Sequence, residues 1–243
     1  MPRRVKIPDT AMVLAAGRGK RMRNLTDRLP KPLVTVAGKP LIDHVLDRLV
    51  EAGVTRAVVN LNYLGERIAG HLAGRDDIAI EFSRESEALE TGGGIRQALP
   101  MLGEVFFAVN ADVFWLDSKD RALERLAATF AVDGADALLL MQPTSRAIGY
   151  EGAGDFLLDP MGQARRRGER EIAPYVFAGV EIVHRRLFDD APAGAFSINR
   201  LWDGAIEHGR LGGLVHDGEW YHIGTPEGLA MAEAGLKTRS VER

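Results

Sequence analysis

Positive charge is concentrated in one short stretch of this sequence. Residues 18–31 carry a net charge of +5, whereas the whole chain of 243 residues carries a net charge of −3. An apolar run and the turn Gly17-Arg18-Gly19 lead into this stretch. The backbone amides of a glycine turn and a cluster of cations both attract phosphate groups. The stretch therefore predicts a polyphosphate site, and its basic residues are Arg18, Lys20, Arg21, Arg23, Arg28 and Lys31.

Two well-known phosphate motifs do not fit this turn. The dinucleotide fingerprint GxGxxG would place its third glycine at residue 22, which is Met22. The Walker A loop needs Ser or Thr after Gly-Lys, but Arg21 follows Gly19-Lys20. Short motifs are weak without their context, so a glycine turn beside a solvated basic surface remains the alternative.

Two other stretches could take part in the same chemistry. Asp112 closes the run Asn110-Ala111-Asp112 after an apolar segment, and a carboxylate in that position suits Mg²⁺. The alternative for Asp112 is a turn or a helix cap. The segment Glu90–Gly94 reads ETGGG, and three successive glycines at the start of a helix allow a ligand to approach the backbone closely.

The elements that must position these residues alternate between strands and helices. We expect strands at 10–15, 54–61, 78–82, 105–109 and 135–141, and helices at 40–52, 63–73, 94–99 and 119–131. This alternation predicts an α/β fold with a doubly wound, mostly parallel, Rossmann-like sheet. The three stretches then fall at the carboxyl ends of strands, which is the edge where such sheets bind ligands.

The pattern changes after about residue 142. Residues 146–183 carry short extended pieces and glycine turns, with the strongest strand at 173–183, and they predict a smaller β-rich lobe. Helices are expected at 184–190, 199–208 and 226–236, with short strands at 211–215 and 219–223. We expect a single domain over 1–243, with a core at 11–141, the β-rich lobe at 142–225, and a closing helix and tail at 226–243.

Composition excludes several classes of protein. The pI of about 6.1 argues against a nucleic-acid-binding protein, and the absence of cysteine excludes disulfides and thiolate catalysis. No stretch approaches the roughly 18 apolar residues of a membrane span. We expect a cytoplasmic protein that uses neither nucleic acid nor membrane as a partner.

Several of these stretches together carry a family resemblance. The run LAAGRGKRM, the segments LPKPLV and AGKPLIDH, and ETGGG resemble the sugar-phosphate nucleotidylyltransferases, closely over 11–113 and more loosely over 173–236. The resemblance implies a GT-A-like fold and transfer of a nucleotidyl group from an NTP to a sugar 1-phosphate, with Mg²⁺ as cofactor and release of pyrophosphate.

The substrates follow from the same resemblance. The ETGGG stretch and the short chain are most similar to members that use UTP and N-acetylmuramate 1-phosphate in peptidoglycan recycling. Mannose 1-phosphate with GTP, or choline phosphate with CTP, is the alternative pair. A non-catalytic regulator that binds a nucleotide sugar is an alternative of another class. A dehydrogenase is the weakest option, because the fingerprint breaks at Met22. A monomer or a small homo-oligomer is compatible with the sequence.

The resemblance also assigns roles to residues. It implies Arg21, Lys31 and Asp112 as catalytic residues, with Asp112 on the metal. The nucleotide would contact Leu14, Ala15, Ala16, Gly17, Arg18, Gly19, Glu90, Thr91 and Gly92. Gly149, Gly179 and Asn199 would contact the sugar phosphate, and Asn62 joins them because it ends a predicted strand. The remaining cations of the basic stretch would steer anions into the site.

One position departs from the family pattern. Most relatives have Asp in the stretch before Gly224-Thr225-Pro226, whereas this chain has His222. Mg²⁺ could be held by Asp112 and substrate phosphates alone, a softer metal could be used, or His222 could bind phosphate while another carboxylate serves. We favour the first explanation.

The resemblance to enzymes that use a muramate raises one further requirement. A muramate carries a lactyl carboxylate and would need a cation, which Arg200 or the run 165–167 could supply. The alternative for the arginine run is a solvated hairpin tip, as for most runs of charge.

Overall fold

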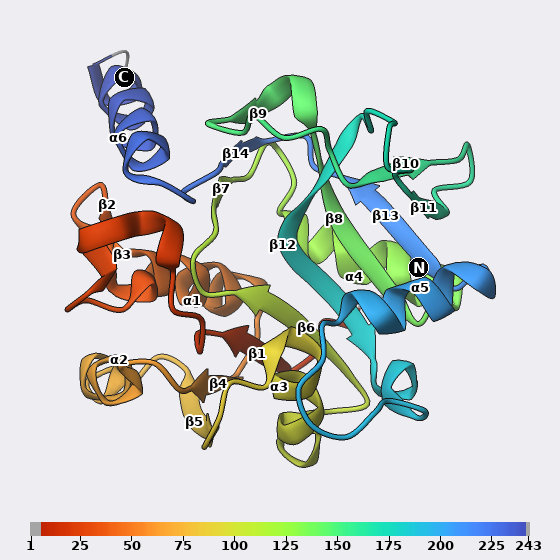
Figure 1. The fold of residues 1–243 in the computed structure, drawn as a ribbon, viewed down its shortest axis with the longest axis horizontal. Helices are drawn as coiled ribbons and strands as arrows, with labels where there is room; N and C mark the ends of the chain where they lie inside the picture. Colours follow the sequence, from red (N-terminus) through yellow and green to blue (C-terminus); the bar gives the residue numbers. More distant parts are fainter. Residues whose placement is uncertain (1–5, 242–243) are drawn as a thin grey trace.

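A nine-stranded sheet forms the centre of the molecule (Figure 1). The structure is a computed structural model that describes residues 6–241, with the side chains of 23–24, 131–133 and 238–241 left out. The sheet runs in the order β11-β10-β12-β6-β1-β4-β5, and β8 and β13 extend it from β12. Its strands are β1 (Thr10–Leu14), β4 (Arg56–Leu61), β5 (Ala79–Arg84), β6 (Val105–Asn110), β8 (Ala137–Pro143), β10 (Phe156–Leu158), β11 (Ala164–Arg166), β12 (Tyr175–His184) and β13 (Leu211–Val215).

The strands that precede the predicted site run parallel to one another. β1 pairs in parallel with β4 and β6, and β4 pairs in parallel with β5, so their carboxyl ends meet at one edge. β8 and β13 are also parallel. This arrangement confirms the predicted α/β class with a mostly parallel sheet. The strand expected at 173–183 is present as β12, but it lies antiparallel between β6 and β8, inside the main sheet.

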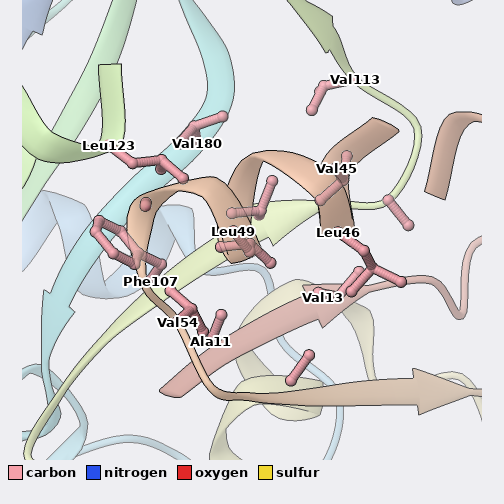
Figure 2. Close-up of a cluster of buried hydrophobic side chains, with 14 of the residues drawn as sticks. Ala11, Val13, Val45, Leu46, Leu49, Val54, Phe107, Val113, Leu123 and Val180 are labelled. Carbon is pink, nitrogen blue, oxygen red and sulfur yellow. The ribbon is translucent and has the colours of Figure 1, made fainter. Parts of the chain in front are cut away.

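Side chains on alternate strand positions fill the two faces of the sheet. Five helices cover these faces: α1 (Leu41–Ala52), α2 (Gly65–Leu72), α3 (Glu90–Ala98), α4 (Ala122–Asp133) and α5 (Asn199–Glu207). On one face, Val13 and Phe107 pack with Val45 and Leu49 of α1, as Figure 2 shows. On the other face, Met12 packs with residues of α3 and α5. Burial on both faces explains why β1 is an almost continuous apolar run.

A third apolar cluster lies beside the basic stretch. It joins Met22, Leu41 and Tyr221 to Ala232 of α6 (Pro226–Val241). Figure 1 shows α6 and the ribbon β2-β3 at the end of the molecule away from β10 and β11. The small sheets contain β2 (Thr35–Val36) with β3 (Lys39–Pro40), and β7 (Phe114–Leu116) with β14 (Glu219–Tyr221) and β9 (Ala147–Ile148).

Short 3-10 helices account for the main local differences from expectation. The basic stretch contains η1 (Lys20–Thr26) and η2 (Lys31–Leu33), where a loop was expected. The helix expected at 184–190 is the single turn η5 (Arg185–Phe188). The others are η3 (Leu99–Met101) and η4 (Thr144–Arg146). Among the described residues, no helix is both long and apolar enough to cross a membrane.

Candidate functional site

Three adjoining pockets open at the carboxyl edge of the parallel strands. Their volumes are about 330, 320 and 290 Å³, and Asn110 at the end of β6 lines all three. The register aligns Val13 of β1 with Val59 of β4 and with Val109 of β6. The segments that follow these strands therefore come together, although they are about 50 residues apart in the chain. We call the cavities the loop pocket, the Asp112 pocket and the Trp202 pocket.

The loop pocket collects most of the predicted nucleotide-binding residues. The glycine turn forms one wall, and the start of α3 forms another. Arg18 is exposed, and its guanidinium carbon lies 5.1 Å from the centre of the Tyr63 ring. The predicted residues that line the pocket are Leu14, Ala16, Gly17, Arg18, Asn62, Glu90, Thr91 and Asp112; the additional ones are Asn60, Glu85, Ala88 and Asn110.

A buried hydrogen-bond network holds the two walls of the loop pocket together. The Ala15 amide donates to Asn60 Oδ1 at 2.7 Å, and Asn60 Nδ2 donates to Glu85 Oε1 at 2.6 Å. The other carboxylate oxygen of Glu85 accepts from the Leu89 amide at 3.2 Å. In this structure the Ala15 amide is engaged by Asn60, and its predicted contact with the nucleotide stays a prediction. Asn60 and Glu85 were missed, and their place beside strand ends is the signal that could have found them.

Gly19 supports the site from behind. Its φ of +60° lies in the left-handed region, and a Cβ there would meet Lys31 Cβ at 2.9 Å. Its carbonyl accepts from Thr26 Oγ1 at 3.1 Å and from the Met22 amide at 2.9 Å. Gly19 does not line the loop pocket; it turns the chain into η1 and leaves room for Lys31, and its predicted contact with the nucleotide stays a prediction.

The three glycines of ETGGG pack closely against other segments of the protein. A Cβ on Gly92 would lie 2.3 Å from a ring carbon of Phe196, and the Gly92 amide donates to the Phe196 carbonyl at 2.9 Å. A Cβ on Gly93 would meet the Gly194 carbonyl at 2.5 Å, and one on Gly94 would meet Glu85. This face of α3 packs against the segment before α5, and the predicted role of Gly92 in ligand contact stays a prediction.

Thr91 and Glu90 lie at the mouth of the loop pocket. Thr91 Oγ1 accepts from the Ile198 amide at 3.0 Å, which ties α3 to the start of α5. Glu90 has a φ of +58°, a strained value for a residue that is not glycine. Strain of this kind accompanies functional sites and needs the surrounding structure to hold it.

The Asp112 pocket brings together the predicted catalytic residues. Lys31 Nζ lies 2.6 Å from Asp112 Oδ2, and the Lys31 side chain is 11% exposed. Arg21 and His222 line the same pocket. The other residues of its wall are Asn110, Val113, Tyr150, Asp155, Val176, Phe177, Ala178, Gly179, Trp220, Tyr221 and Ile223. Lys20 and Arg28 are exposed and line none of the three pockets, and the side chain of Arg23 lies outside the described residues.

The two glycines predicted near the sugar phosphate have different surroundings. Gly179 lines the Asp112 pocket at the irregularity of β12, where its φ is +78° and a Cβ would lie 2.4 Å from Val113 Cγ1. Gly149, with a φ of +76°, lies behind His222, and a Cβ there would meet the His222 carbonyl at 3.3 Å. Gly149 does not line the Asp112 pocket, and its assignment to ligand contact stays a prediction. Asn62 lines the loop pocket with the glycine turn, and its amide nitrogen donates to the Glu85 carbonyl at 3.1 Å. Its grouping with the sugar phosphate stays a prediction.

His222 lies in a strongly cationic environment. Burial lowers the pKa of its imidazole, and the charges of Arg21 and Lys31 lower it further, while Asp112 opposes them. The rings of Tyr150 and Trp220 each lie 5.7 Å from the His222 ring. These effects favour the neutral imidazole at pH 7.

The donors at this site fit Mg²⁺ bound through few protein ligands. Asp112 lies at the carboxyl edge of the sheet, its side chain is partly exposed, and it lines two of the pockets. In the part of the chain that the structure describes, no three His, Asp or Glu side chains cluster to bind a metal ion by protein ligands alone. Mg²⁺ commonly takes one or two carboxylates and completes its shell with phosphate and water. Asp155, which the sequence did not single out, is a second carboxylate on the wall and accepts from the Phe177 amide at 3.0 Å.

The Trp202 pocket contains Asn199 and an unexpected buried acid. Glu181 is 2% exposed, and Trp202 Nε1 donates to its Oε2 at 3.1 Å. Burial raises the pKa of Glu181 to about 8, so its carboxyl group is largely neutral at pH 7. The wall comprises Leu14, Thr91, Asn110, Asp155, Phe156, Arg166, Phe177, Glu181, Ser197, Ile198, Asn199 and Trp202.

Comparisons with known proteins agree with this geometry. A nucleotidyl transferase family model matches residues 10–151. The chain is 42% identical over 236 residues to N-acetylmuramate alpha-1-phosphate uridylyltransferase of Caulobacter vibrioides, covering 94% of this chain and 97% of that protein. It is 37% identical over 231 residues to the protein of the same name from Neisseria meningitidis serogroup B, covering 92% and 96%.

Solved structures agree on the fold. The structure of UDP-glucose pyrophosphorylase complexed with UDP-glucose matches with a TM-score of 0.81 at 15% identity, over 96% of this chain and 100% of that chain. HddC from Yersinia pseudotuberculosis matches with a TM-score of 0.76 at 22% identity. The family model and the two relatives that match along nearly their whole length identify this chain as a member of the nucleotidyl transferase family.

Proposed function

We propose that the protein transfers a uridylyl group from UTP to N-acetylmuramate 1-phosphate and releases pyrophosphate. The observation that carries this proposal is the position of Asp112. It lines the loop pocket and the Asp112 pocket together, with Lys31 on its carboxylate. Two phosphorylated substrates that entered the two pockets would meet at this residue.

The reaction needs positioning and positive charge more than it needs a general base. A phosphate oxygen of the sugar 1-phosphate is already ionised at pH 7 and attacks the α-phosphorus of UTP. A new P–O bond forms there, the bond between the α-phosphorus and the oxygen bridging to the β-phosphate breaks, and pyrophosphate leaves. The main cost is to bring two anions into line and to stabilise the charge that develops. This demand matches the cationic residues of the cleft.

Each substrate has a pocket suited to it. The exposed glycine turn and Arg18 would hold the nucleotide in the loop pocket, while Arg21 and Lys31 would contact phosphates at the junction. The sugar would extend into the Trp202 pocket, where Asn199, Ser197 and Glu181 offer polar groups for hydroxyl and amide groups. The names of the two relatives support UTP as the nucleotide. The pocket itself gives no basis for selecting a base, because Phe196 packs against the glycine face of α3.

Asp112 is the residue that would hold Mg²⁺. When bound, Mg²⁺ supplies positive charge to the phosphate oxygens and polarises them as a Lewis acid. The neutral, aromatic-flanked His222 is poorly suited to this hard cation, which supports Asp112 and substrate oxygens as the main ligands. Lys31 would leave Asp112 for a phosphate when the substrates bind.

The cellular setting follows from the proposed substrates. UTP is a cytoplasmic nucleotide, and a chain without cysteine is compatible with that compartment. N-acetylmuramate 1-phosphate would place the enzyme in peptidoglycan recycling. A monomer or a small homo-oligomer remains our expectation for its assembly.

Pyrophosphate release tests the proposal directly. The purified protein would be given each of four NTPs with N-acetylmuramate, N-acetylglucosamine and mannose 1-phosphates and with choline phosphate, in Mg²⁺. We expect the highest kcat/KM with UTP and N-acetylmuramate 1-phosphate. Preference for GTP with mannose 1-phosphate would replace the substrate assignment. If no pair of substrates releases pyrophosphate and a nucleotide sugar binds tightly, the protein would be a regulator and not an enzyme.

A further inference from the structure

Three consecutive arginines on the hairpin β10-β11 are directed to different places. Successive side chains of an extended chain point to opposite faces, so residues 165 and 167 lie on the other face from residue 166. Arg165 is exposed and pairs with Glu171, with Nη2 at 2.8 Å from Oε1. Arg167 donates to backbone carbonyls, among them Gly154 at 3.0 Å and Glu171 at 3.2 Å. Arg166 alone of the three lines the Trp202 pocket.

The Arg166 guanidinium is held in a defined orientation. Its central carbon lies 5.2 Å from the centre of the Phe156 ring and 5.8 Å from that of Trp202. Nη2 donates to the Asn199 carbonyl at 3.1 Å, and Nε donates to Asp203. Within the described residues these bonds engage two of the five N–H groups, so three remain for a ligand. Stacking on aromatic rings keeps the planar fork in place when a ligand arrives.

The other ionisable groups of this pocket are Asp155 and Glu181. Asp155 accepts from the Phe177 amide, and Glu181 is buried beside Trp202. Among the described residues of the wall, Arg166 supplies the positive charge. Its pair with Asp203, whose side chain is 53% exposed, lies toward solvent, and exposed pairs of this kind contribute little energy. Charge and geometry therefore favour a carboxylate ligand for the guanidinium N–H groups of Arg166 that Asn199 and Asp203 do not engage.

Arg200, the other cation that the sequence offered, belongs to a different cavity. It lines a pocket of about 240 Å³ with Asp136, His208 and Arg210. That pocket shares no residue with the three pockets of the carboxyl edge. Arg200 is therefore not placed to reach a substrate whose phosphate lies at Asp112.

We propose that Arg166 is a specificity-determining residue that binds the carboxylate of an acidic sugar substrate. This inference rests on the proposed function. The Trp202 pocket shares Asn110, Asp155 and Phe177 with the Asp112 pocket, so a sugar with its 1-phosphate at Asp112 can extend toward Arg166. A muramate carries an ether-linked lactyl carboxylate that the parent N-acetylglucosamine lacks. A guanidinium fork matches a carboxylate through two parallel hydrogen bonds.

The test compares one variant with a neighbour on the same strand. Arg166→Gln removes the cation, Arg166→Lys keeps the charge without the fork, and Arg165→Gln is the matched control outside the pocket. Steady-state kinetics with saturating UTP would give kcat and KM for N-acetylmuramate 1-phosphate. N-acetylglucosamine 1-phosphate would be measured beside it, as a substrate or, if it is not turned over, as a competitive inhibitor.

We expect Arg166→Gln to raise KM for the muramate by about 10- to 100-fold, as loss of a charge-assisted bidentate contact does, with a smaller change in kcat. Arg166→Lys should recover part of the loss, and Arg165→Gln should change little. Binding of N-acetylglucosamine 1-phosphate should change by less than about twofold in all three variants, because it lacks the carboxylate.

Equal losses for both sugars would overturn the proposal, since they would mean that Arg166 only shapes the pocket. An unchanged KM for the muramate in Arg166→Gln would also overturn it while leaving the proposed function intact. Failure of the wild-type protein to use the muramate would overturn the proposed function itself, and the assignment of Arg166 with it.

Discussion

Lys31 Nζ and Asp112 Oδ2 lie 2.6 Å apart, although 81 residues separate them in the chain. The lysine comes from η2 after the basic stretch, and the aspartate follows β6. Lys31 is largely buried, and a buried ammonium group needs a partner of opposite charge. In the free protein this partner is Asp112, the same carboxylate that would bind the metal. Substrate phosphates must therefore exchange places with it, so substrate binding and assembly of the metal site are coupled.

Replacing Lys31 by Met should separate these two functions. We expect kcat to fall by about 10²- to 10³-fold, because a positive charge beside the reacting phosphate is lost. Mg²⁺ alone should bind more tightly to the variant than to the wild-type protein, since Asp112 no longer has a competing cation. Calorimetric titration with MgCl₂ and a pyrophosphate assay would measure the two effects. Weaker Mg²⁺ binding in Lys31→Met would contradict the competition between lysine and metal.

Asp112→Ala should abolish turnover and leave the fold intact. Loss of the ion pair leaves the largely buried Lys31 without its partner, so the unfolding temperature should fall, but the protein should still unfold in one cooperative transition. Pyrophosphate release and thermal unfolding by circular dichroism would check both statements. Appreciable remaining activity at saturating Mg²⁺ would show that another group, with Asp155 as the first candidate, binds the metal.

His222→Asp introduces the carboxylate that the family resemblance implies at this position. If Asp112 and phosphates suffice for Mg²⁺, the variant should keep its kcat within about tenfold of wild type and need less Mg²⁺, because a second carboxylate joins the site. Turnover would be measured against Mg²⁺ and Mn²⁺ concentration in both proteins. A loss of more than about 10²-fold with Mg²⁺ would show that the neutral His222 has a role of its own in binding phosphate.

Gly19→Ala and Gly17→Ala form a matched pair for the glycine turn. A methyl group at residue 19 would meet Lys31 Cβ at 2.9 Å in a backbone with φ of +60°, whereas one at residue 17 would meet nothing within 4 Å. We expect Gly19→Ala to cost about 1–2 kcal/mol, or roughly 2–8 °C in unfolding temperature, and to lower kcat through the displaced Lys31. Gly17→Ala should unfold within about 1 °C of wild type. Equal unfolding temperatures for the two variants would disprove the steric argument.

Glu181 should make the stability of the protein depend on pH. Its pKa of about 8 in the folded protein lies above the ordinary value of 4.5, so the folded state binds a proton that the unfolded state has lost. Stability from this group therefore falls as the pH rises from about 4.5 to about 8 and is constant above that range. Glu181→Gln removes the titration and keeps an acceptor for Trp202. The unfolding temperature of this variant, relative to wild type, should rise by at least about 3 °C between about pH 5 and pH 8.5.

The exposed acid Glu87 supplies the control for this measurement. Glu87→Gln serves as the control because it makes the same chemical change at a side chain that is exposed in the folded protein, and we expect its difference from wild type to be similar at both pH values. A pH-independent difference between Glu181→Gln and wild type would show that the buried carboxyl group is charged in the folded protein.

The local features of the chain were predictable because they depend on neighbouring residues. The apolar run of β1 and the helix expected at 40–52, which the structure shows as α1 ending before Gly53, each follow from periodicity or from the conformation that glycine permits. The position of Asp112 at the edge of the sheet was predictable, because it follows an apolar strand. The convergence of the glycine turn, Glu90 and Asp112 at one edge also followed, since parallel strands share their carboxyl edge.

Close packing between distant segments was not predictable in the same way. The glycines of α3 looked like a surface for a ligand, but Phe196 occupies it from more than 100 residues away. Gly149 supports His222 from behind, and the Ala15 amide is taken by Asn60. A glycine indicates only that something approaches the backbone, and the identity of that neighbour depends on how the whole chain folds.

By itself, therefore, the sequence determined the alternation of strands and helices, the family and the residue types that gather at the carboxyl edge. Local periodicity and motif spacing contain this information. Only the tertiary structure decided which of those residues line a pocket, that Lys31 pairs with Asp112, and that Arg166 faces the Trp202 pocket while Arg165 does not. These outcomes depend on strand register and on contacts between residues far apart in the chain, and a single sequence does not contain them in readable form.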